Sequence, residues 1–316
     1  SGKPIAIIPQ IGAHLMASTW IDDIRTFSAP HPTDDGVSLL ADCLSGYGKV
    51  GIPMGRESAL RMPLRDFRGL TARCGHLEFV DVSDLMMRLR MVKSEREIAL
   101  LREICGSGSA AFANAANLFH EGQSLKEVFR TFRIELLRQG ADDVPYLVGG
   151  AGQGGYGDVI SPPTDKELKS GDVLMLDTGA TKNGYFCDFD RNFAFGSACD
   201  EVRAAHEKLV LAVRAAAAVA RPGRTCADLF SAMTAVRGQD DGDVGRMGHG
   251  LGMQLTETPS ITSFDATGLQ ENMVMTLEPS MVLGNEKMMV HEENIVVRDG
   301  PPEFLSTPAS EEIQVI

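Results

Sequence analysis

Three aspartates interrupt a segment that otherwise has the composition of buried strands. Residues 173–193, VLMLDTGATKNGYFCDFDRNF, carry Asp177, Asp188 and Asp190 among apolar side chains. An ionised carboxylate removed from water costs several kcal/mol unless a positive charge meets it. Arg191 is the one obvious cation nearby in the sequence. The segment therefore predicts a buried β-hairpin whose acids need a positive charge from elsewhere.

Length and charge restrict what the chain can bind. Its 316 residues suit two domains, and its net charge of −13 comes with scattered basic residues. Such an acidic chain is a poor candidate for binding nucleic acid or an anionic membrane, whereas divalent cations suit it. The sequence shows neither a transmembrane span nor a signal peptide. Its six scattered cysteines predict reduced thiols and a cytoplasmic location.

The pattern of elements changes near residue 90. Before it, the stretches KPIAIIP, KVGIPMG and LEFVDVS read as strands, and DGVSLLADCL has helical spacing. This predicts a small α/β domain over residues 1–90, which begins abruptly at a strand. After it, capping-box pairs at Ser94/Glu97 and Ser124/Glu127 predict two helices, and strands follow them.

The order of helix, helix and strands then repeats. A helix over DEVRAAHEKLVLAVRAAAAVA is followed by one that starts at Thr225, with Asp228 in the capping position, and by three strand segments. The repeat predicts an α+β domain over residues 91–316 in which two related halves enclose a cleft between two sheets.

Five polar residues occupy predicted strand positions in these two halves: Asp177, Asp188, His249, Glu278 and Glu293. Each has an ordinary explanation. Aspartate beside Asn-Gly is common in turns, a lone histidine between glycines is more often a hydrogen-bonded core residue, and glutamate at a strand end is usually solvated. Together, however, four carboxylates in one cleft would repel one another unless cations joined them.

Two divalent metal ions bridged by carboxylates would supply that charge and keep the acids ionised. Oxygen-rich ligation with one nitrogen favours Mn, with Co, Fe or Zn as alternatives, and the lack of a thiolate argues against structural zinc. The sequence thus predicts a metal centre as the partner of the first hairpin.

The same segments resemble the pita-bread metallopeptidase superfamily, which includes creatinase, aminopeptidase P, prolidase and methionine aminopeptidase. LMLDTGATKNGYFCDFDRNF is similar to the family's aspartate hairpin, GHGLGMQLTETPSI to its histidine strand, and TLEPSMVL and HEENIVV to its glutamate strands. LRMVKSEREI looks like the junction that follows the N-terminal domain in the creatinase-prolidase branch.

The resemblance implies a pita-bread catalytic domain behind a partial creatinase-like N-terminal domain, and a homodimer. It implies that Asp177, Asp188, His249, Glu278 and Glu293 bind two metal ions, and that Glu278 also acts as general base. The ions would hold a bridging hydroxide that cleaves an amide-type C–N bond in a short peptide or small molecule. No substrate-binding residue is identified, and the sequence does not name the substrate.

Two family histidines are missing, and the corresponding positions are Ile160 and Thr256. Their absence puts peptidase activity in doubt and leaves two alternatives open. One is a non-peptidase member, such as an amidinohydrolase or a lyase acting on a small metabolite, and the other is an inactive binding module. Asp190 also departs from the family, in which threonine is common. It is expected to be solvated or paired with Arg191, and a contact with a cationic substrate is the alternative.

Overall fold

The computed structural model describes residues 2–33, 36–238, 245–284 and 286–316. The chain divides into two compact units, Ser1–Met86 and Met87–Ile316. The division falls within helix α4 (Ser83–Met91), close to the domain boundary expected from the sequence. Among the described residues, no helix is both long enough and apolar enough to cross a membrane.

The first unit is built from two pairs of parallel strands and short helices, as an α/β pattern requires. Strand β1 pairs with β2, and β3 pairs with β4. A small apolar cluster around Val37, Leu70 and Cys74 joins α2 to α3. The elements are β1 (Ile5–Pro9), η1 (Gln10–Gly12), α1 (Ala13–Met16), β2 (Asp23–Phe27), α2 (Val37–Leu44), β3 (Lys49–Ile52), α3 (Leu64–Arg73) and β4 (Glu78–Asp81).

The second unit starts with helices whose N-termini are fixed by capping boxes. The Ser94 and Ser124 side chains each accept a hydrogen bond from the third helical backbone amide, and the glutamate there bonds back, which confirms both predicted helix starts. The elements of this half are α5 (Glu95–Ala113), α6 (Ala115–Leu118), α7 (Leu125–Arg138), β5 (Asp143–Gln153), β6 (Asp172–Lys182), β7 (Tyr185–Phe186) and β8 (Phe189–Ala194).

The second half repeats this order. Thr225 and Asp228 form the third predicted capping box, at the start of α9. The elements are α8 (Asp200–Val219), α9 (Cys226–Arg237), β9 (His249–Gly250), β10 (Glu257–Ser260), β11 (Val274–Leu277), β12 (Ser280–Leu283), β13 (Lys287–Val290), β14 (Glu293–Val296), β15 (Glu303–Phe304) and β16 (Gln314–Val315).

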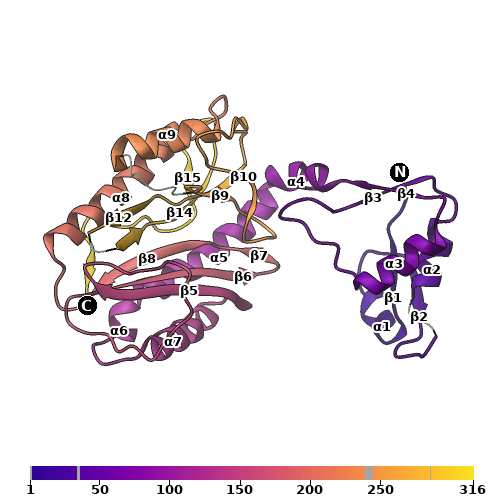
Figure 1. The fold of residues 1–316 in the computed structure, drawn as a ribbon, viewed down its shortest axis with the longest axis horizontal. Helices are drawn as coiled ribbons and strands as arrows, with labels where there is room; N and C mark the ends of the chain where they lie inside the picture. Colours follow the sequence, from indigo (N-terminus) through magenta and orange to yellow (C-terminus); the bar gives the residue numbers. More distant parts are fainter. Residues whose placement is uncertain (1, 34–35, 239–244, 285) are drawn as a thin grey trace. The chain divides into compact units, whose positions relative to one another are not determined.

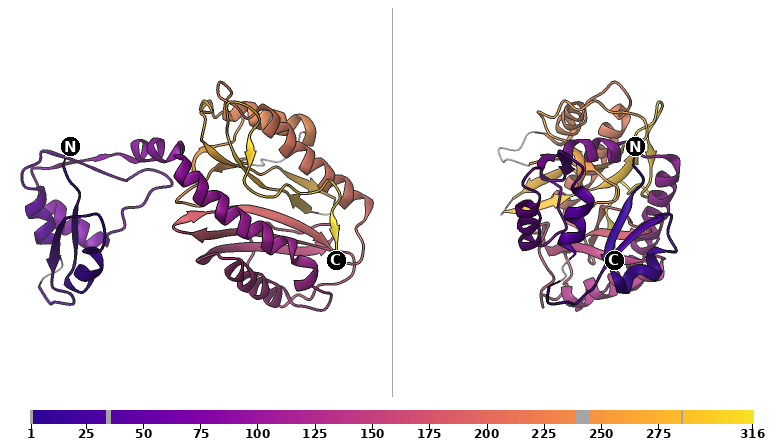
Figure 2. Two further views of the ribbon diagram at one scale, coloured as in Figure 1. Left: turned by 180° about the vertical axis from the view of Figure 1, so that it is seen from behind. Right: turned by 90° about the vertical axis from the view of Figure 1, so that its right-hand side faces the viewer.

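The described residues of the second unit form two five-stranded sheets, one around β6 and β8 with β16 of the second half at its edge, and helices cover the outer faces. One sheet has the order β16-β8-β6-β5 with β7 beside β6, and the other has the order β10-β9-β11-β14-β15. Figure 1 shows the sheets between α8 and α9 on one side and α6 and α7 on the other, and Figure 2 shows α5 lying along the first sheet. This is the predicted pseudo-two-fold α+β architecture, in which two sheets face each other.

A buried ion pair connects the start of the second unit to its second sheet. Lys93 Nζ lies 3.0 Å from Glu257 Oε2, and both side chains are at most 2% exposed. The Lys93 backbone amide also donates to the carbonyl of Asn272. Burial lowers the pKa of Lys93, and the charge of Glu257 opposes that shift. The pair therefore depends on both partners staying charged.

Breaking this pair is predicted to destabilise the second unit strongly. Lys93→Met leaves an uncompensated buried carboxylate, so the free energy of unfolding should fall by about 3–5 kcal/mol. The double variant Lys93→Met/Glu257→Leu should recover most of that loss. Urea unfolding monitored by circular dichroism measures the free energy of unfolding of both variants.

Lys126 provides the matched control, because its pair with Asp165 is exposed (53% and 84%). Exposed pairs contribute about 0–1 kcal/mol, so Lys126→Met should change little. Equal effects of the two lysine substitutions would contradict a special role for the buried pair.

Candidate metal centre

Three aspartates lie together on the first sheet. Asp177 in β6 is paired directly with Asp190 in β8, and Asp188 lies two residues before Asp190. Side chains that are directly opposite, or two residues apart, share a face of a sheet. All three aspartates are buried. The three acids of the predicted hairpin therefore converge on one place, where a positive charge could meet all of them.

The second sheet contributes a histidine and two glutamates to the same region. His249 lies in β9, Glu278 follows β11, and Glu292 precedes β14. Leu277 is paired with Glu293, so the antiparallel register continued by one residue sets Glu278 opposite Glu292. Gly250 is required beside His249, because a Cβ there would approach the Thr258 carbonyl oxygen to 2.4 Å.

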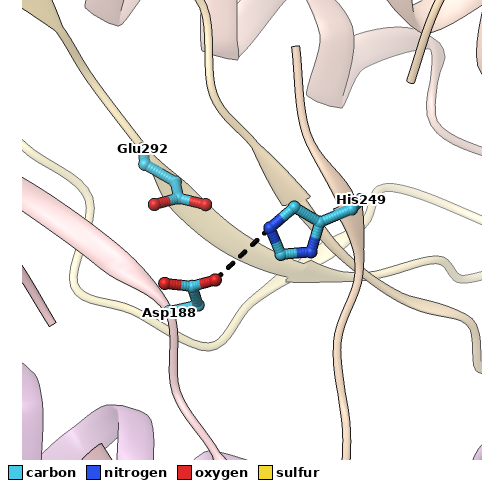
Figure 3. A group of neighbouring side chains, drawn as sticks. All are labelled: Asp188, His249 and Glu292. Atoms are coloured by element: carbon cyan, nitrogen blue, oxygen red, sulfur yellow. Dashed lines mark ion pairs between the residues drawn. The ribbon is translucent and has the colours of Figure 1, made fainter. Parts of the chain in front are cut away.

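Asp188, His249 and Glu292 form the tightest group, with one potential ligand atom from each lying within 4.8 Å of the others. Figure 3 shows the three side chains pointing toward one another from different strands. His249 Nε2 lies 3.3 Å from Asp188 Oδ2. His249 Nδ1 lies 2.9 Å from the Gly250 carbonyl oxygen, to which it can only donate, so Nε2 is the nitrogen left for a ligand.

Backbone and side-chain hydrogen bonds hold these groups in place. Asn294 in β14 accepts from the Asp188 amide (3.0 Å) and donates to the Asp188 carbonyl, which ties the two sheets together. The Thr276 hydroxyl accepts from the His249 amide at 3.1 Å. The positions of Asp188 and His249 are therefore fixed by the fold.

Burial raises the pKa of three acids of the cluster. Burial, followed by the charges of neighbouring acids, holds the pKa of Asp177 and Glu292 well above its usual range. Burial is also the main cause that raises the pKa of half-buried Glu278 to about 7. Asp177 Oδ1 and Glu292 Oε1 are buried with no hydrogen-bond partner among the described residues. Such a set of unpartnered oxygens beside an imidazole nitrogen fits divalent cations.

Burial opposes a charged imidazole at His249, but the hydrogen bond and charge of Asp188 outweigh that effect and raise the pKa of His249. The negative charge of the neighbouring carboxylate therefore stabilises a positive charge on the His249 imidazole.

Glu293, expected from the sequence as a ligand, is not brought into this cluster. Its carboxylate lies 2.9 Å from Arg191 Nη2 and 3.2 Å from His291 Nε2, and it accepts hydrogen bonds from Ser306 and the Ala309 amide. Although burial acts the other way, Arg191 and His291 lower the pKa of Glu293 to about 2. Successive strand residues face opposite ways, so Glu292 takes the place expected for Glu293.

Asp190 differs from expectation as well. It is buried rather than solvated, and Arg191 Nη1 donates to its backbone carbonyl rather than to its carboxylate. The His291 ring lies beside that carboxylate, with Nδ1 3.6 Å from Asp190 Oδ1. The expectation that Asp190 is solvated or forms a side-chain pair with Arg191 is therefore wrong.

Two further residues beside the cluster were not expected from the sequence. The Tyr146 hydroxyl lowers the pKa of the Asp177 carboxyl, against the larger opposite effects of burial and of the neighbouring acids. Arg246 donates to the Thr256 hydroxyl at 3.2 Å, and its charge acts on Asp188 and His249. Neither residue stood out, because an aromatic in a strand and an arginine near a turn are ordinary.

The positions of the two absent family histidines hold no imidazole. Ile160 lies in the segment between β5 and β6 and is 67% exposed. Thr256 lies immediately before β10, with its hydroxyl bonded to Arg246.

Comparison with known proteins agrees with this geometry. The profile of metallopeptidase family M24 matches residues 99–299, well over half of the chain. A Xaa-Pro dipeptidase of Pyrococcus furiosus is 28% identical over 211 residues, which cover 65% of this chain and 60% of that protein. A probable dipeptidase PepE of Mycobacterium tuberculosis is 28% identical over 290 residues, covering 88% of this chain and 75% of that protein.

Solved structures show the same fold. An X-Pro aminopeptidase from Thermotoga maritima superimposes with a TM-score of 0.83 at 24% identity, covering 98% of this chain and 87% of that one. A prolidase from Thermococcus sibiricus superimposes with a TM-score of 0.88 at 21% identity, covering 100% of this chain and 85% of that one.

The two facing sheets and their cluster of buried acids define a pita-bread metallohydrolase. The chain belongs to metallopeptidase family M24. This confirms the superfamily, the fold class and the enzyme class expected from the sequence.

The opposite environments of Glu292 and Glu293 predict opposite effects on the stability of metal-free protein. The pKa of Glu292 is raised in the folded state, so its contribution to stability is lost as pH rises above the unfolded value of about 4.3. Glu292→Gln should therefore raise the melting temperature of chelator-treated protein, and more at pH 8 than at pH 5.

Glu293→Gln is the matched control. The pKa of Glu293 is lowered, so its stabilising contribution is present above the unfolded value, and its loss should lower the melting temperature at both pH values. A lower melting temperature for Glu292→Gln at pH 8 would show that Glu292 is stably paired without metal.

Proposed function

We propose that this chain is a dinuclear metal-dependent hydrolase that cleaves an amide-type C–N bond in a short peptide or small molecule. The observation that carries the proposal is the convergence of Asp188 and Glu292, from the two sheets, on His249. Among the described residues, Asp177 Oδ1 and Glu292 Oε1 have no hydrogen-bond partner. The proposed ligands are Asp177, Asp188, His249, Glu278 and Glu292, with Glu292 replacing Glu293.

The bound ions and the chain's own residues would have different roles in the reaction. Divalent ions, when bound, would polarise the scissile carbonyl and acidify the attacking water. Glu278 would act as the proton carrier, the role that the family resemblance implies for it; without metal, burial raises the pKa of its carboxyl to about 7. The Tyr146 hydroxyl would orient Asp177, and the Gly250 carbonyl would hold the tautomer of His249.

Oxygen-rich ligation with one imidazole favours Mn, with Co, Fe or Zn as alternatives. The Xaa-Pro dipeptidase and dipeptidase names of the relatives support a peptide or dipeptide-sized substrate for this chain. We further propose a homodimer in the cytoplasm, which rests on the resemblance to the creatinase-prolidase branch and on the scattered cysteines. Light scattering that gave a mass near 34.0 kDa at micromolar concentration would overturn the dimer.

Metal content tests the ligand set. After loading with Mn and dialysis, the wild type should retain about two ions per chain by elemental analysis. Glu292→Gln and Asp188→Ala should each lose at least one, because each removes an oxygen of the cluster, whereas Glu293→Gln should keep both. Loss of metal from Glu293→Gln but not from Glu292→Gln would reverse the assignment.

The absence of imidazole at Ile160 and Thr256 predicts weak cleavage of Xaa-Pro dipeptides even with full metal. Losing one positioned acid–base or polarising group typically costs roughly 10²–10⁴ in rate. The kcat/KM of Mn-loaded protein should therefore stay below about 10⁴ M⁻¹s⁻¹, the lower end of ordinary enzymes.

The same assay should be run on small N-acyl and amidino compounds, where higher activity is expected. A value above that threshold on Xaa-Pro dipeptides would show that other groups replace the two histidines. Full metal content with no hydrolysis of any compound would favour the binding module.

A further inference from the structure

The strand that carries Asp188 is interrupted at that residue. Strand β7 ends at Phe186 and β8 begins at Phe189, so Asp188 lies in a gap between two paired segments. The preceding Cys187 amide still donates to the Ala180 carbonyl of β6 at 3.0 Å, and the ladder with β6 resumes at Phe189. The backbone N–H and C=O of buried Asp188 therefore need partners from outside this ladder, because buried backbone groups without a hydrogen bond are costly.

A single side chain of the second sheet supplies both partners. Asn294 Oδ1 accepts from the Asp188 amide at 3.0 Å, and Asn294 Nδ2 donates to the Asp188 carbonyl. A carboxamide that bonds both backbone groups of one residue takes the part of a neighbouring strand. Both residues are buried, so the bonds are shielded from competition with water. Asn294 thereby fixes the backbone of Asp188 relative to the second sheet.

Cys105 of helix α5 sets the orientation of this carboxamide. Its thiol donates to Asn294 Oδ1 at 3.3 Å, and its side chain is fully buried. Burial raises the pKa of the Cys105 thiol well above its usual range, so the sulfur keeps the hydrogen that it donates. The Asn294 oxygen faces two donors and its nitrogen faces an acceptor. Rotation of the carboxamide by half a turn would set donor against donor.

Strand β14 holds Asn294 in place from the other side. The Asn294 amide donates to Ser306 Oγ at 3.0 Å. Across the ladder, Asn294 is paired with Thr276, whose hydroxyl accepts from the His249 amide. Glu292 lies two residues before Asn294 and therefore shares its face of the strand. The same stretch of chain thus presents a proposed ligand of its own and holds a proposed ligand of the other sheet.

We propose that Asn294 is a positioning residue of the metal centre, which holds Asp188 at the distance from the second sheet that metal binding requires. The tightest group of potential ligands draws its atoms from both sheets, and Asn294 joins the sheets at one of those ligands. Cys105 acts one step further away, because it directs the carboxamide oxygen. The inference rests on the proposed hydrolase function, since it concerns the same metal centre.

Manganese affinity tests this role with two buried asparagines. Asn294→Ala should weaken Mn binding by about 10–100-fold, the range for losing a residue that hydrogen-bonds a metal ligand. Asn192 is the matched control. Its buried carboxamide donates to the Val290 carbonyl at 2.7 Å and accepts from the Tyr156 hydroxyl at 3.1 Å, and neither partner is a proposed ligand. Asn192→Ala should lower the melting temperature, as Asn294→Ala does, but leave the Mn dissociation constant unchanged.

Cys105 provides a second comparison with a milder change. Cys105→Ala removes the donor to the carboxamide and should weaken Mn binding less than Asn294→Ala does. Cys105→Ser keeps a donor and should recover part of that loss. Chelator competition with Mn-loaded protein measures the dissociation constants, and the melting temperatures of metal-free samples report the purely structural effect of each substitution.

Equal Mn dissociation constants for the wild type and Asn294→Ala, or an equal loss of affinity in Asn192→Ala, would overturn the positioning role. Asn294→Ser and Asn192→Ser make the same comparison if an alanine variant does not fold. A wild type that holds no Mn would instead overturn the proposed function, and elemental analysis of the same samples distinguishes this outcome from the others.

Discussion

Repulsion between buried carboxylates is the constraint on which the rest of this structure depends. Asp177, Asp188, Glu278 and Glu292 come from two sheets and meet around one imidazole, where burial raises the pKa of each acid. A fold that only needed stability would not collect such groups, since each costs several kcal/mol when it is unpaired. Asn294 and Thr276 accept hydrogen bonds from the backbone amides of Asp188 and His249, and these bonds keep the cluster together against that repulsion.

The buried acids of the second unit fall into two kinds. Glu293 and Glu257 have cations within 3.0 Å, Arg191 and Lys93 respectively, and they stabilise the frame. Asp177 and Glu292 keep oxygens without partners among the described residues, and they face the centre. The paired acids hold the strands that present the unpaired ones, so the adjacent residues Glu292 and Glu293 have different roles. This division explains why two adjacent glutamates are predicted to respond oppositely to substitution.

Much of the fold could be predicted because its signals are local. Capping boxes at Ser94, Ser124 and Thr225 set helix starts, and the Asn183-Gly184 turn set the first hairpin. The feature that distinguishes Glu292 from Glu293 as a proposed metal ligand is not local in the sequence. It depends on which residue faces Glu278 across β11, and a shift of one residue in strand register reverses the face.

Residues recruited through tertiary contacts were also beyond sequence reasoning. Tyr146 reaches Asp177 from a neighbouring strand, and Arg246 reaches Thr256 across a hairpin, so neither forms a motif. The environment of Asp190 could not be predicted either, because His291, whose Nδ1 lies 3.6 Å from its carboxylate, is about a hundred residues away in the chain.

The most direct test of the central claim is anomalous diffraction from crystals of Mn-loaded protein at the manganese edge. We expect two anomalous peaks between the sheets, with Glu292 and His249 Nε2 at about 2.0–2.2 Å from them, the usual range for such ligands, and Glu293 still bound to Arg191. Peaks ligated by Glu293, or a fully loaded crystal with no peak at His249, would contradict it.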